Sequence, residues 1–234
     1  MNVKVNPFVT IYITNYNYGQ FLHKAIQSVE SQTFDDLELI IIDDGSDDGS
    51  RSIIEEYAKR ENIFSLFQQN RGLNASNNVA QKMARGKYIM RLDADDFLAP
   101  QAVEIMTAEL ERNSDVALVF PDYYLVDEDG EVMQQIRRHD FESDVTLLDQ
   151  PAHGACTMIR TEVLRAVGGY DQEFARQDGY DLWLSVTSQY PVKNINLPLF
   201  YYRQHDKSIT NNEKELLKTR GEIKAKHVQK RQLD

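Results

Sequence analysis

The chain has 234 residues, of which 41% are hydrophobic, and this suits one sizeable α/β domain with a complete core. Its 37 acidic residues against 26 Lys and Arg give a formal net charge of -11, which repels a nucleic-acid backbone, so we expect no nucleic-acid partner. The single cysteine excludes an internal disulfide, and no stretch approaches the roughly 20 apolar residues of a membrane-spanning helix. Because no export signal is recognisable either, we expect a cytoplasmic protein.

Short β-rich runs alternate with longer helical patterns from residue 8 onward, which is typical of a parallel sheet with crossover helices. The predicted order is strand 8–16, helix 21–32, strand 37–44, helix 50–60, strand 63–70, helix 74–84 and strand 87–93. The run "LELIIIDD" is dominated by apolar residues, as expected of a central strand covered on both faces. We therefore predict a Rossmann-like α/β fold, a mixed but mainly parallel sheet with helices on both faces.

The second half of the chain has a more mixed pattern. Its predicted elements are a helix over 100–113, a strand and hairpin over 116–133 turning at Asp129 and Gly130, a strand and helix within 153–171, a helix over 180–190 and an extended run over 192–205. Pro100 is expected at the first helical position, Thr161 at a helix N-cap, and Gly168 with Gly169 at a helix end.

Polar clusters follow three predicted strands, at the points where ligands bind in doubly wound sheets. "TNYNYGQF" follows the first strand, "DDGSDDGS" the second and "DADD" the fourth. Asp93 and Asp95 are two apart in an extended segment, so both carboxylates point the same way and can share one hard divalent cation. The alternative is that these aspartates, Asp96 in particular, cap the following helix in water.

The combination of "TNYNYGQFLHKAIQSVESQTFDDLELIIIDDGSDDGS", "NRGLNASNNVA" and "GKYIMRLDADD", in this order, resembles the large inverting nucleotide-sugar glycosyltransferase family with the GT-A fold, often called family 2. The match covers residues 8 to 210. The resemblance implies transfer of a sugar from a nucleotide-diphosphate donor to a hydroxyl of a saccharide or lipid-linked saccharide acceptor. It also implies a setting in bacterial cell-surface polysaccharide or lipopolysaccharide synthesis.

The resemblance also implies roles for the residues of a donor site. The residues that would line the nucleotide pocket are Thr14, Asn15, Tyr16, Asp43 and Asp44. Asp93 would lie near the ribose, and Asp95 would ligate a Mg or Mn ion that bridges the two donor phosphates. His205 would complete the metal site or contact phosphate, against the alternative of a structural histidine. Arg71 could reach a donor phosphate, against the alternative of a solvated loop charge.

Inversion requires a base that deprotonates the acceptor hydroxyl as it attacks the anomeric carbon. In the family that this chain resembles, the segment reads Glu-Asp, one residue, Asp and then an apolar stretch. Here the segment is "RQDGYDLWL", so Gly179 stands where the usual aspartate would be. Asp178 is the nearest carboxylate and the predicted base, while Asp181 is the second candidate and better suited to a helix cap or structural contact. Tyr180 and Trp183 could stack on an acceptor sugar, with core packing as the alternative for Trp183.

Two other function classes compete with this interpretation. A sugar-nucleotide nucleotidyltransferase also pairs a Rossmann-like sheet with metal-binding aspartates, but it needs a glycine-rich phosphate loop after the first strand. "TNYNYGQF" contains one glycine, which disfavours that class. A catalytically idle module that binds the nucleotide sugar is the third class, and Gly179 at the usual base position is the observation behind it.

The C-terminal segment differs in charge from the remainder of the chain. Residues 213–234 carry seven Lys or Arg against four Asp or Glu. We predict one catalytic domain over 1–212, with a nucleotide-binding half at about 8–98 and an acceptor half at about 99–212, followed by a basic helical tail. The tail is a candidate for peripheral contact with an anionic membrane surface, against the alternative of a solvated or dimer-forming helix.

Overall fold

A computed structural model of the protein describes residues 6–138, 154–174, 178–205 and 213–233, and for Asp178, 213–216 and 229–233 it describes the backbone alone. The helices are α1 (Gly19–Glu30), α2 (Ser50–Tyr57), α3 (Leu73–Met83), α4 (Ala102–Arg112), α5 (Thr161–Ala166), α6 (Asp178–Thr187) and α7 (Glu213–Leu233). The strands are β1 (Val9–Asn15), β2 (Leu37–Asp43), β3 (Ile63–Phe67), β4 (Tyr88–Asp93), β5 (Phe97–Leu98), β6 (Leu118–Val126), β7 (Val132–Ile136), β8 (Met158–Arg160) and β9 (Val192–Arg203).

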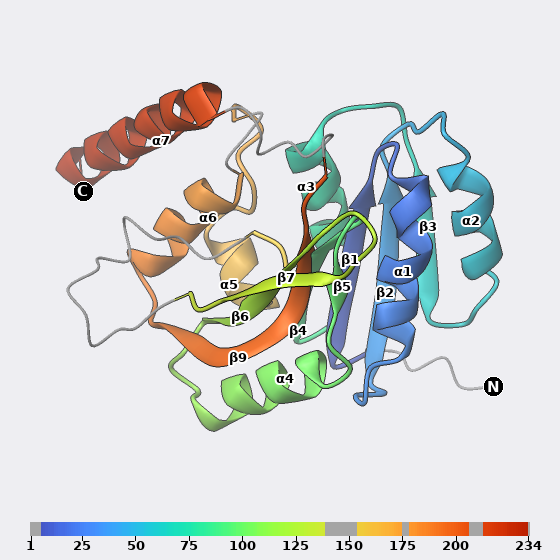
Figure 1. Ribbon diagram of the computed structural model, residues 1–234. Helices are drawn as coiled ribbons and strands as arrows, with labels where there is room; N and C mark the ends of the chain where they lie inside the picture. Colours follow the sequence, from blue (N-terminus) through green and yellow to red (C-terminus); the bar gives the residue numbers. More distant parts are fainter. Residues whose placement is uncertain (1–5, 139–153, 175–177, 206–212, 234) are drawn as a thin grey trace.

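The strands form one mixed sheet in the order β3-β2-β1-β4-β8-β6-β9-β5, with β7 paired to β6 (Figure 1). The first four strands are all parallel, with β1 between β2 and β4. β8 runs antiparallel between β4 and β6 and so joins the two halves of the sheet, while β6 and β9 are parallel to each other. The predicted Rossmann-like mixed sheet is therefore confirmed.

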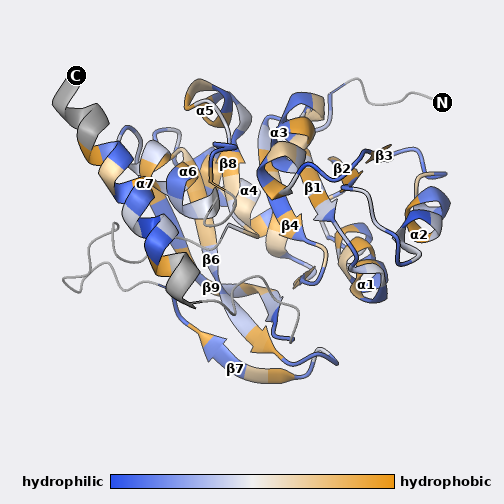
Figure 2. Cartoon of the chain, turned by 90° about the horizontal axis from the view of Figure 1, so that it is seen from above, coloured by the Kyte–Doolittle hydropathy of each residue, from blue (hydrophilic) through white to orange (hydrophobic). Residues whose placement is uncertain are grey.

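Helices cover both faces of the sheet because its central strands are apolar on both faces. Alternate residues of β1 belong to different cores: Ile11 and Ile13 pack with α1, α2 and α4, whereas Tyr12 packs with α3, α5 and α6. β2 repeats this alternation, as the period of two in a strand requires. Two buried cores, one on each face, hold the strand ends in place (Figure 2).

Two local predictions for the second half are wrong, and one short strand was missed. Pro100 precedes α4, which begins at Ala102, and its carbonyl accepts the Thr33 N–H at 2.9 Å. Thr161 is the first residue of α5 and not its cap, because its hydroxyl donates to the Gly86 carbonyl at 2.7 Å. The short strand β5 was not predicted, since it has two residues and forms only by pairing with β9.

The C-terminal helix α7 lies against α6 at the edge of the molecule (Figures 1 and 2). Ile223 on α7 is fully buried in the core that contains α6. Leu217 and Val228 on the same helix are exposed. Within the described part of the chain, no helix combines the length and the apolar character needed to cross a bilayer.

Candidate active site

The carboxyl ends of β1, β2 and β4 bring four of the predicted site residues together. Asn15 ends β1 and lies opposite Asp43, which ends β2. Thr14 lies opposite Asp93, which ends β4. Because neighbouring parallel strands end at the same edge of a sheet, the register alone gathers these side chains at one place.

Asn15 and Asp43 are joined to each other and to the turn that follows β2. Asn15 is 1% exposed, and its Nδ2 donates to Asp43 Oδ1 at 2.8 Å and to Ser46 Oγ at 3.0 Å. The Ser46 hydroxyl donates to Asp43 Oδ1 at 2.6 Å and accepts the Asn17 N–H at 2.9 Å. Asn17 has a positive φ of 61°, a backbone conformation that Asn tolerates better than most residues. These bonds fix the loops after β1 and β2 relative to each other.

Asp44 holds the loop that follows β3. Its N–H donates to the Asn15 carbonyl at 2.8 Å, and its carboxylate accepts the N–H groups of Arg71 at 2.9 Å and Gly72 at 2.8 Å. Gln68 Nε2 donates to the same carboxylate at 2.7 Å. Arg71 is exposed, so its backbone is anchored beside Asp44 while its side chain lies at the surface. The structure therefore brings Arg71 to the same strand-end region as Asp44.

Both aspartates keep capacity for a further hydrogen bond. Among the described residues, Oδ2 of Asp43 accepts only the Ser46 N–H at 3.2 Å, and Oδ2 of Asp44 accepts only the Gly72 N–H. A carboxylate oxygen has two lone pairs, so each of these atoms can accept one more donor. Tyr16 is 48% exposed next to them. The two carboxylates are therefore held in place and each keeps an oxygen that can accept a further hydrogen bond.

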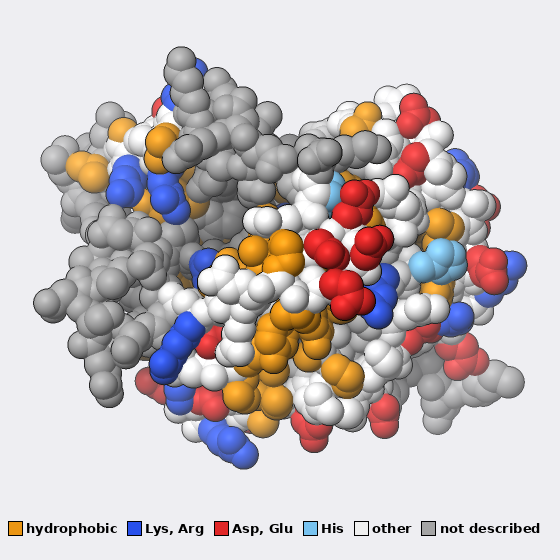
Figure 3. Space-filling model, viewed as in Figure 1, with side chains coloured by type: hydrophobic (Ala, Val, Ile, Leu, Met, Phe, Trp, Pro, Cys, Tyr) orange, Lys and Arg blue, Asp and Glu red, His pale blue; other side chains and the backbone are white. Residues whose placement is uncertain are grey.

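The three aspartates after β4 form one cluster. Asp93, Asp95 and Asp96 each offer a carboxylate oxygen, and these atoms all lie within 4.8 Å of one another. Asp95 is not in extended backbone as predicted, because β4 ends at Asp93 and a turn follows, closed by the Asp96 N–H on the Asp93 carbonyl at 3.1 Å. The helix-cap alternative is wrong, since the chain continues into β5 and not into a helix. Figure 3 shows a group of acidic side chains at one place on the surface of the molecule.

Arg91 and His205 contact two of these carboxylates. Arg91 is buried on β4, and its Nε lies 2.5 Å from Asp93 Oδ1. His205 comes from the segment after β9, and its Nε2 lies 3.0 Å from Asp95 Oδ2. The His205 side chain is only 2% exposed and packs against the rings of Tyr18 and Phe21 on α1. The predicted proximity of His205 to Asp95 is therefore found in the structure.

Arg203 connects the aspartate cluster to the turn between β6 and β7. Its N–H donates to Asp96 Oδ1 at 2.9 Å, and its Nε donates to the Asp95 carbonyl at 2.8 Å. Its Nη1 donates to the carbonyls of Asp127 and Glu128, in the turn of the β6–β7 hairpin, at 3.3 and 2.5 Å. One buried guanidinium thus fixes the turn after β4 and the hairpin turn together.

The cluster raises the pKa of acids around it. Burial raises the pKa of Asp96 well above its usual value, and the charges of Asp95 and Asp93 raise it further. Burial, and then the same two aspartates, also raise the pKa of the Tyr18 phenol. Burial raises the pKa of the Cys156 thiol, with a smaller contribution from Asp96. The local field is therefore strongly negative, and a divalent cation would relieve it.

The donor set fits a hard divalent metal. Carboxylate oxygens are the ligands that Mg and Mn prefer, and the cluster supplies three carboxylates within reach of one another. Oδ2 of Asp96 is buried and has no hydrogen-bond partner among the described residues. A buried oxygen of this kind requires a partner, and a nearby cation satisfies it. Asp93, Asp95 and Asp96 are the carboxylates that could hold such an ion, and His205 lies beside Asp95.

The acceptor-side candidates lie at the start of α6. Asp178 is the first residue of this helix, and its side chain lies outside the described part of the structure. Asp181 is buried, and its Oδ1 lies 2.9 Å from His227 Nε2 of α7. Tyr180 and Trp183 are each 2% exposed and belong to the core, so acceptor stacking by these two rings is wrong. Asp181 therefore has the structural contact that the sequence suggested.

The packing around residue 179 explains why this residue is a glycine. A Cβ at this position would lie 2.9 Å from the Gly154 Cα and 3.2 Å from the Gly154 nitrogen. Contacts that short do not occur without displacement of the backbone. The start of α6 is therefore packed backbone to backbone against residue 154, and the usual aspartate has no room there.

Sequence reasoning missed Arg91 and Arg203. Both are charged residues within otherwise apolar or aromatic strand patterns, "KYIMRLD" and "LFYYRQH". A charge in a buried strand is rare unless it is paired, so each arginine could have been read as the partner of a nearby carboxylate. Arg91 lies two residues before "DADD", whereas nothing in the sequence places Arg203 near that cluster.

The chain matches the family model described as "Glycosyl transferase family 2" over residues 10–168. It is 30% identical over 191 residues to a chondroitin synthase of Escherichia coli, covering 81% of this chain and 28% of that one. It is also 30% identical over 212 residues to an uncharacterized glycosyltransferase of Methanocaldococcus jannaschii, covering 84% of this chain and 71% of that one. The chain thus spans less than a third of the synthase and most of the archaeal protein.

Solved structures share the fold at lower sequence identity. Staphylococcus aureus TarS 1-349 in complex with UDP-GlcNAc superposes with a TM-score of 0.71 at 17% identity, covering 86% of this chain and 59% of that one. The mannosyltransferase PcManGT from Pyrobaculum calidifontis, in complex with GDP-Man and Mn2+, superposes with a TM-score of 0.68 at 18% identity, covering 100% and 66%. Identities this low establish the likeness of the fold alone.

Proposed function

This chain belongs to glycosyl transferase family 2, and from that premise we propose that it transfers a sugar, with inversion, from a nucleotide-diphosphate donor to an acceptor hydroxyl. The observation that carries the proposal is the meeting of Asn15, Asp43 and the Asp93–Asp96 cluster at the carboxyl ends of three neighbouring strands. In this proposal the nucleotide and a divalent cation bind side by side at this edge of the sheet.

In the proposed donor complex, the strand ends bind the nucleotide. Thr14, Asn15 and Tyr16 line the base pocket, and Asp43 or Asp44 accepts a base N–H through its Oδ2. Asp93 lies near the ribose, and the exposed Arg71 reaches a phosphate. The likeness to structures that hold UDP-GlcNAc and GDP-Man supports a nucleoside diphosphate sugar as ligand.

A Mg or Mn ion held by Asp95, with His205 and Asp93 beside it, would stabilise the negative charge that develops on the departing diphosphate. The aspartate cluster supports this part of the proposal, and so does the likeness to PcManGT, whose complex contains Mn2+. Arg203 and Arg91 hold the carboxylates in place from the protein side.

The transfer itself is a single displacement. The acceptor hydroxyl oxygen forms a bond to the anomeric carbon, the bond from that carbon to the phosphate oxygen breaks, and the nucleoside diphosphate leaves. Asp178 takes the hydroxyl proton as the bond forms. The burial of Asp181 and its contact with His227 support Asp178 over Asp181 as this base.

The acceptor in this proposal is a saccharide or lipid-linked saccharide in bacterial cell-surface polysaccharide synthesis. Similarity to the chondroitin synthase of Escherichia coli and to a hyaluronan synthase of Pasteurella multocida supports a polysaccharide product. Contact of α7 with a membrane surface and dimerisation through α7 both stay predictions.

The decisive experiment is calorimetric titration with UDP, GDP, CDP and dTDP, each with and without Mn, on the wild-type protein and on Asp95→Ala. We expect one nucleotide to bind tightly, and only when both metal and Asp95 are present. An absence of binding under every condition would remove the donor site from the proposal. Asp47→Asn is the matched control, because Asp47 is exposed and its carboxylate makes no hydrogen bond among the described residues.

A transfer assay with the donor so identified then tests the chemistry. Nuclear magnetic resonance of the product should give the anomeric configuration opposite to that of the donor. Retention of configuration would contradict the single displacement, and nucleotide binding without turnover would favour the idle binding module.

A further inference from the structure

The C-terminal helix α7 contacts the helix that begins with Asp178. His227 Nε2 lies 2.9 Å from Asp181 Oδ1, and the Arg220 guanidinium lies 4.7 Å from the centre of the Tyr180 ring. Asp181 and Tyr180 follow Asp178 within the first turn of α6. These contacts therefore act on the end of α6 that carries the proposed base, and not on its far end.

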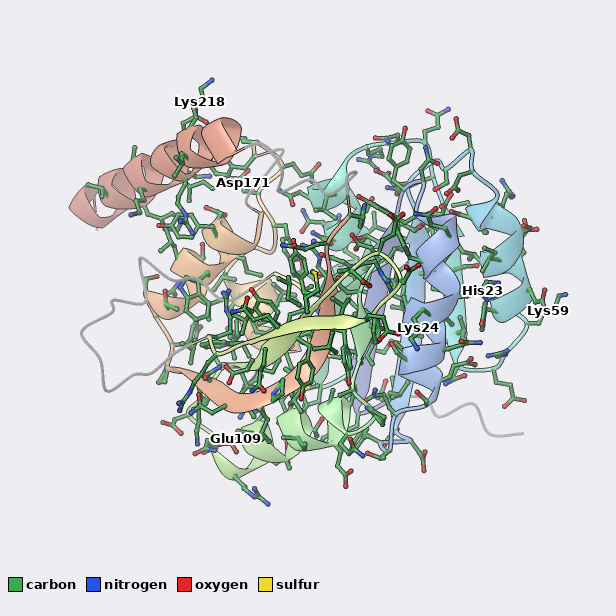
Figure 4. The ribbon with its side chains drawn as sticks, in the orientation of Figure 1. His23, Lys24, Lys59, Glu109, Asp171 and Lys218 are labelled. Carbon is green, nitrogen blue, oxygen red and sulfur yellow. The ribbon has the colours of Figure 1, made fainter. Side chains whose placement is uncertain are left out.

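A second set of contacts holds the chain just before α6. Lys226 forms an ion pair with Asp171, and its Nζ lies 5.1 Å from the centre of the Phe174 ring. Figure 4 shows Asp171 below α7, with Lys218 on the opposite side of the helix and pointing outward. Lys226 and its neighbour His227 thus contact the chain on both sides of residue 178, at Asp171 and at Asp181.

Residues 170–174 are also hydrogen-bonded to α3, which belongs to the proposed donor half. Asn74 Nδ2 of α3 donates to the carbonyls of Asp171 and Phe174, both at 2.7 Å, and Asn78 Nδ2 donates to the Tyr170 carbonyl at 2.7 Å. α3 begins directly after the loop that Asp44 holds. Residues 170–174 therefore lie between α3, which belongs to the donor half, and α7.

Among the described side chains of α7, Ile223 is buried in the core that contains α6, whereas Leu217 and Val228 are exposed. An open groove of about 910 Å³ lies between α3, the loop after α5, α6 and α7, and its lining includes Asp181, Lys226 and His227. The described contacts of His227 and Arg220 with the start of α6 are a hydrogen bond and a cation–π contact, which single substitutions can remove.

We infer that α7 is a clamp that sets the position of the proposed base, with His227 as a positioning residue that acts through Asp181. The inference rests on the proposed function, in which Asp178 accepts the acceptor proton. His227 does not touch the reacting atoms. Its hydrogen bond fixes the rotation of the first turn of α6 and hence the direction from Asp178 to the acceptor. A base displaced by about 1 Å loses on the order of a hundredfold in rate.

His227→Ala and His227→Gln are the test variants, and Lys218→Ala is the control on the exposed side of the same helix. We expect His227→Ala to lower kcat by about 10- to 100-fold, with the donor KM and the nucleotide Kd within about twofold of wild type. The amide of Gln can donate the same hydrogen bond to Asp181, so His227→Gln should recover kcat to within about threefold. Lys218→Ala should behave as wild type.

Thermal unfolding of each variant separates positioning from loss of folding. The clamp is overturned if kcat of His227→Ala is unchanged, or if its loss follows a lowered Tm and weaker nucleotide binding and is not recovered by His227→Gln. Failure of the proposed function has a different signature. In that case the wild-type protein shows no transfer, or Asp178→Asn transfers at the wild-type rate, whatever the result at His227.

Discussion

The proposed donor half and the proposed acceptor half hold their candidate residues in different ways. In the donor half, Asn15, Asp43 and Asp93 end three adjacent parallel strands, and the register of those strands is enough to bring them together. In the acceptor half, Asp178 begins a short helix that is held by core packing of its apolar side chains, by the close approach to Gly154 and by contacts from α3 and α7. A site built on strand ends is fixed by the sheet, whereas a residue on a docked helix is fixed only by its neighbours.

The largest expected effect is a loss of activity at the proposed base, Asp178, in the acceptor half. Asp178→Asn should lower kcat by about 10²- to 10⁴-fold, because a general base contributes that much, and should leave nucleotide binding unchanged. Asp181→Asn is the comparison variant and should cost far less, since its Oδ1 can still accept from His227. Initial-rate kinetics with calorimetry measure both quantities. Equal losses in the two variants would contradict the division of roles between them.

The second prediction concerns the backbone contact at the start of α6. Gly179→Ala places a Cβ 2.9 Å from the Gly154 Cα, so we expect about 1–3 kcal/mol of destabilisation and a lower kcat. Gly221→Ala is the matched control, because nothing lies within 4 Å of its added Cβ, and a helical Gly→Ala change should stabilise by about 0.5–1 kcal/mol. Urea unfolding measures both. A neutral Gly179→Ala would show that α6 can shift freely.

The third prediction tests the rigidity of the donor half. Asp44→Asn replaces one acceptor oxygen with an NH2 group that faces N–H donors from Gln68, Arg71 or Gly72. We expect a loss of about 1–3 kcal/mol in stability and weaker nucleotide binding, because a satisfied buried carboxylate becomes a mispaired amide. Asp47→Asn is the surface control. Unchanged affinity with unchanged stability would mean that the loop at 68–72 does not depend on Asp44.

The smallest expected effect is a pH dependence at the clamp. Burial alone would raise the pKa of Asp171, but the hydrogen bonds from Lys226 and the Glu173 N–H bring it below its usual value of 3.8. A lowered carboxyl pKa contributes stability above the unfolded-state pKa, and this contribution is lost as pH falls through the folded-state pKa.

Because the pair is partly exposed, the contribution should be about 0.2–1 kcal/mol and weaker in high salt. Unfolding free energies of wild type and Asp171→Asn should therefore differ at pH 7 and converge below about pH 4. A constant difference across this range would remove the ion pair as its cause.

The success of prediction from the sequence also differs between the two halves. Asn15, Asp43, Asp44 and Asp93 were placed correctly at strand ends, because apolar runs and turn residues mark where a buried strand stops. The pairing of Asp95 with His205 joins residues far apart in the chain, and the resemblance to a family pointed to it where periodicity could not. The contact between His227 and Asp181 has no sequence signal, since no pattern reveals which helix a polar tail covers.

Cys156 gives the molecule a practical property. It is the chain's only cysteine, it is fully buried, and its raised pKa keeps it in the unreactive thiol form. Thiol-reactive dyes should therefore leave the folded wild-type protein unlabelled. A cysteine introduced in place of the exposed Lys218 would then be the sole labelling site, and a fluorophore attached there would report directly whether α7 leaves α6 during turnover.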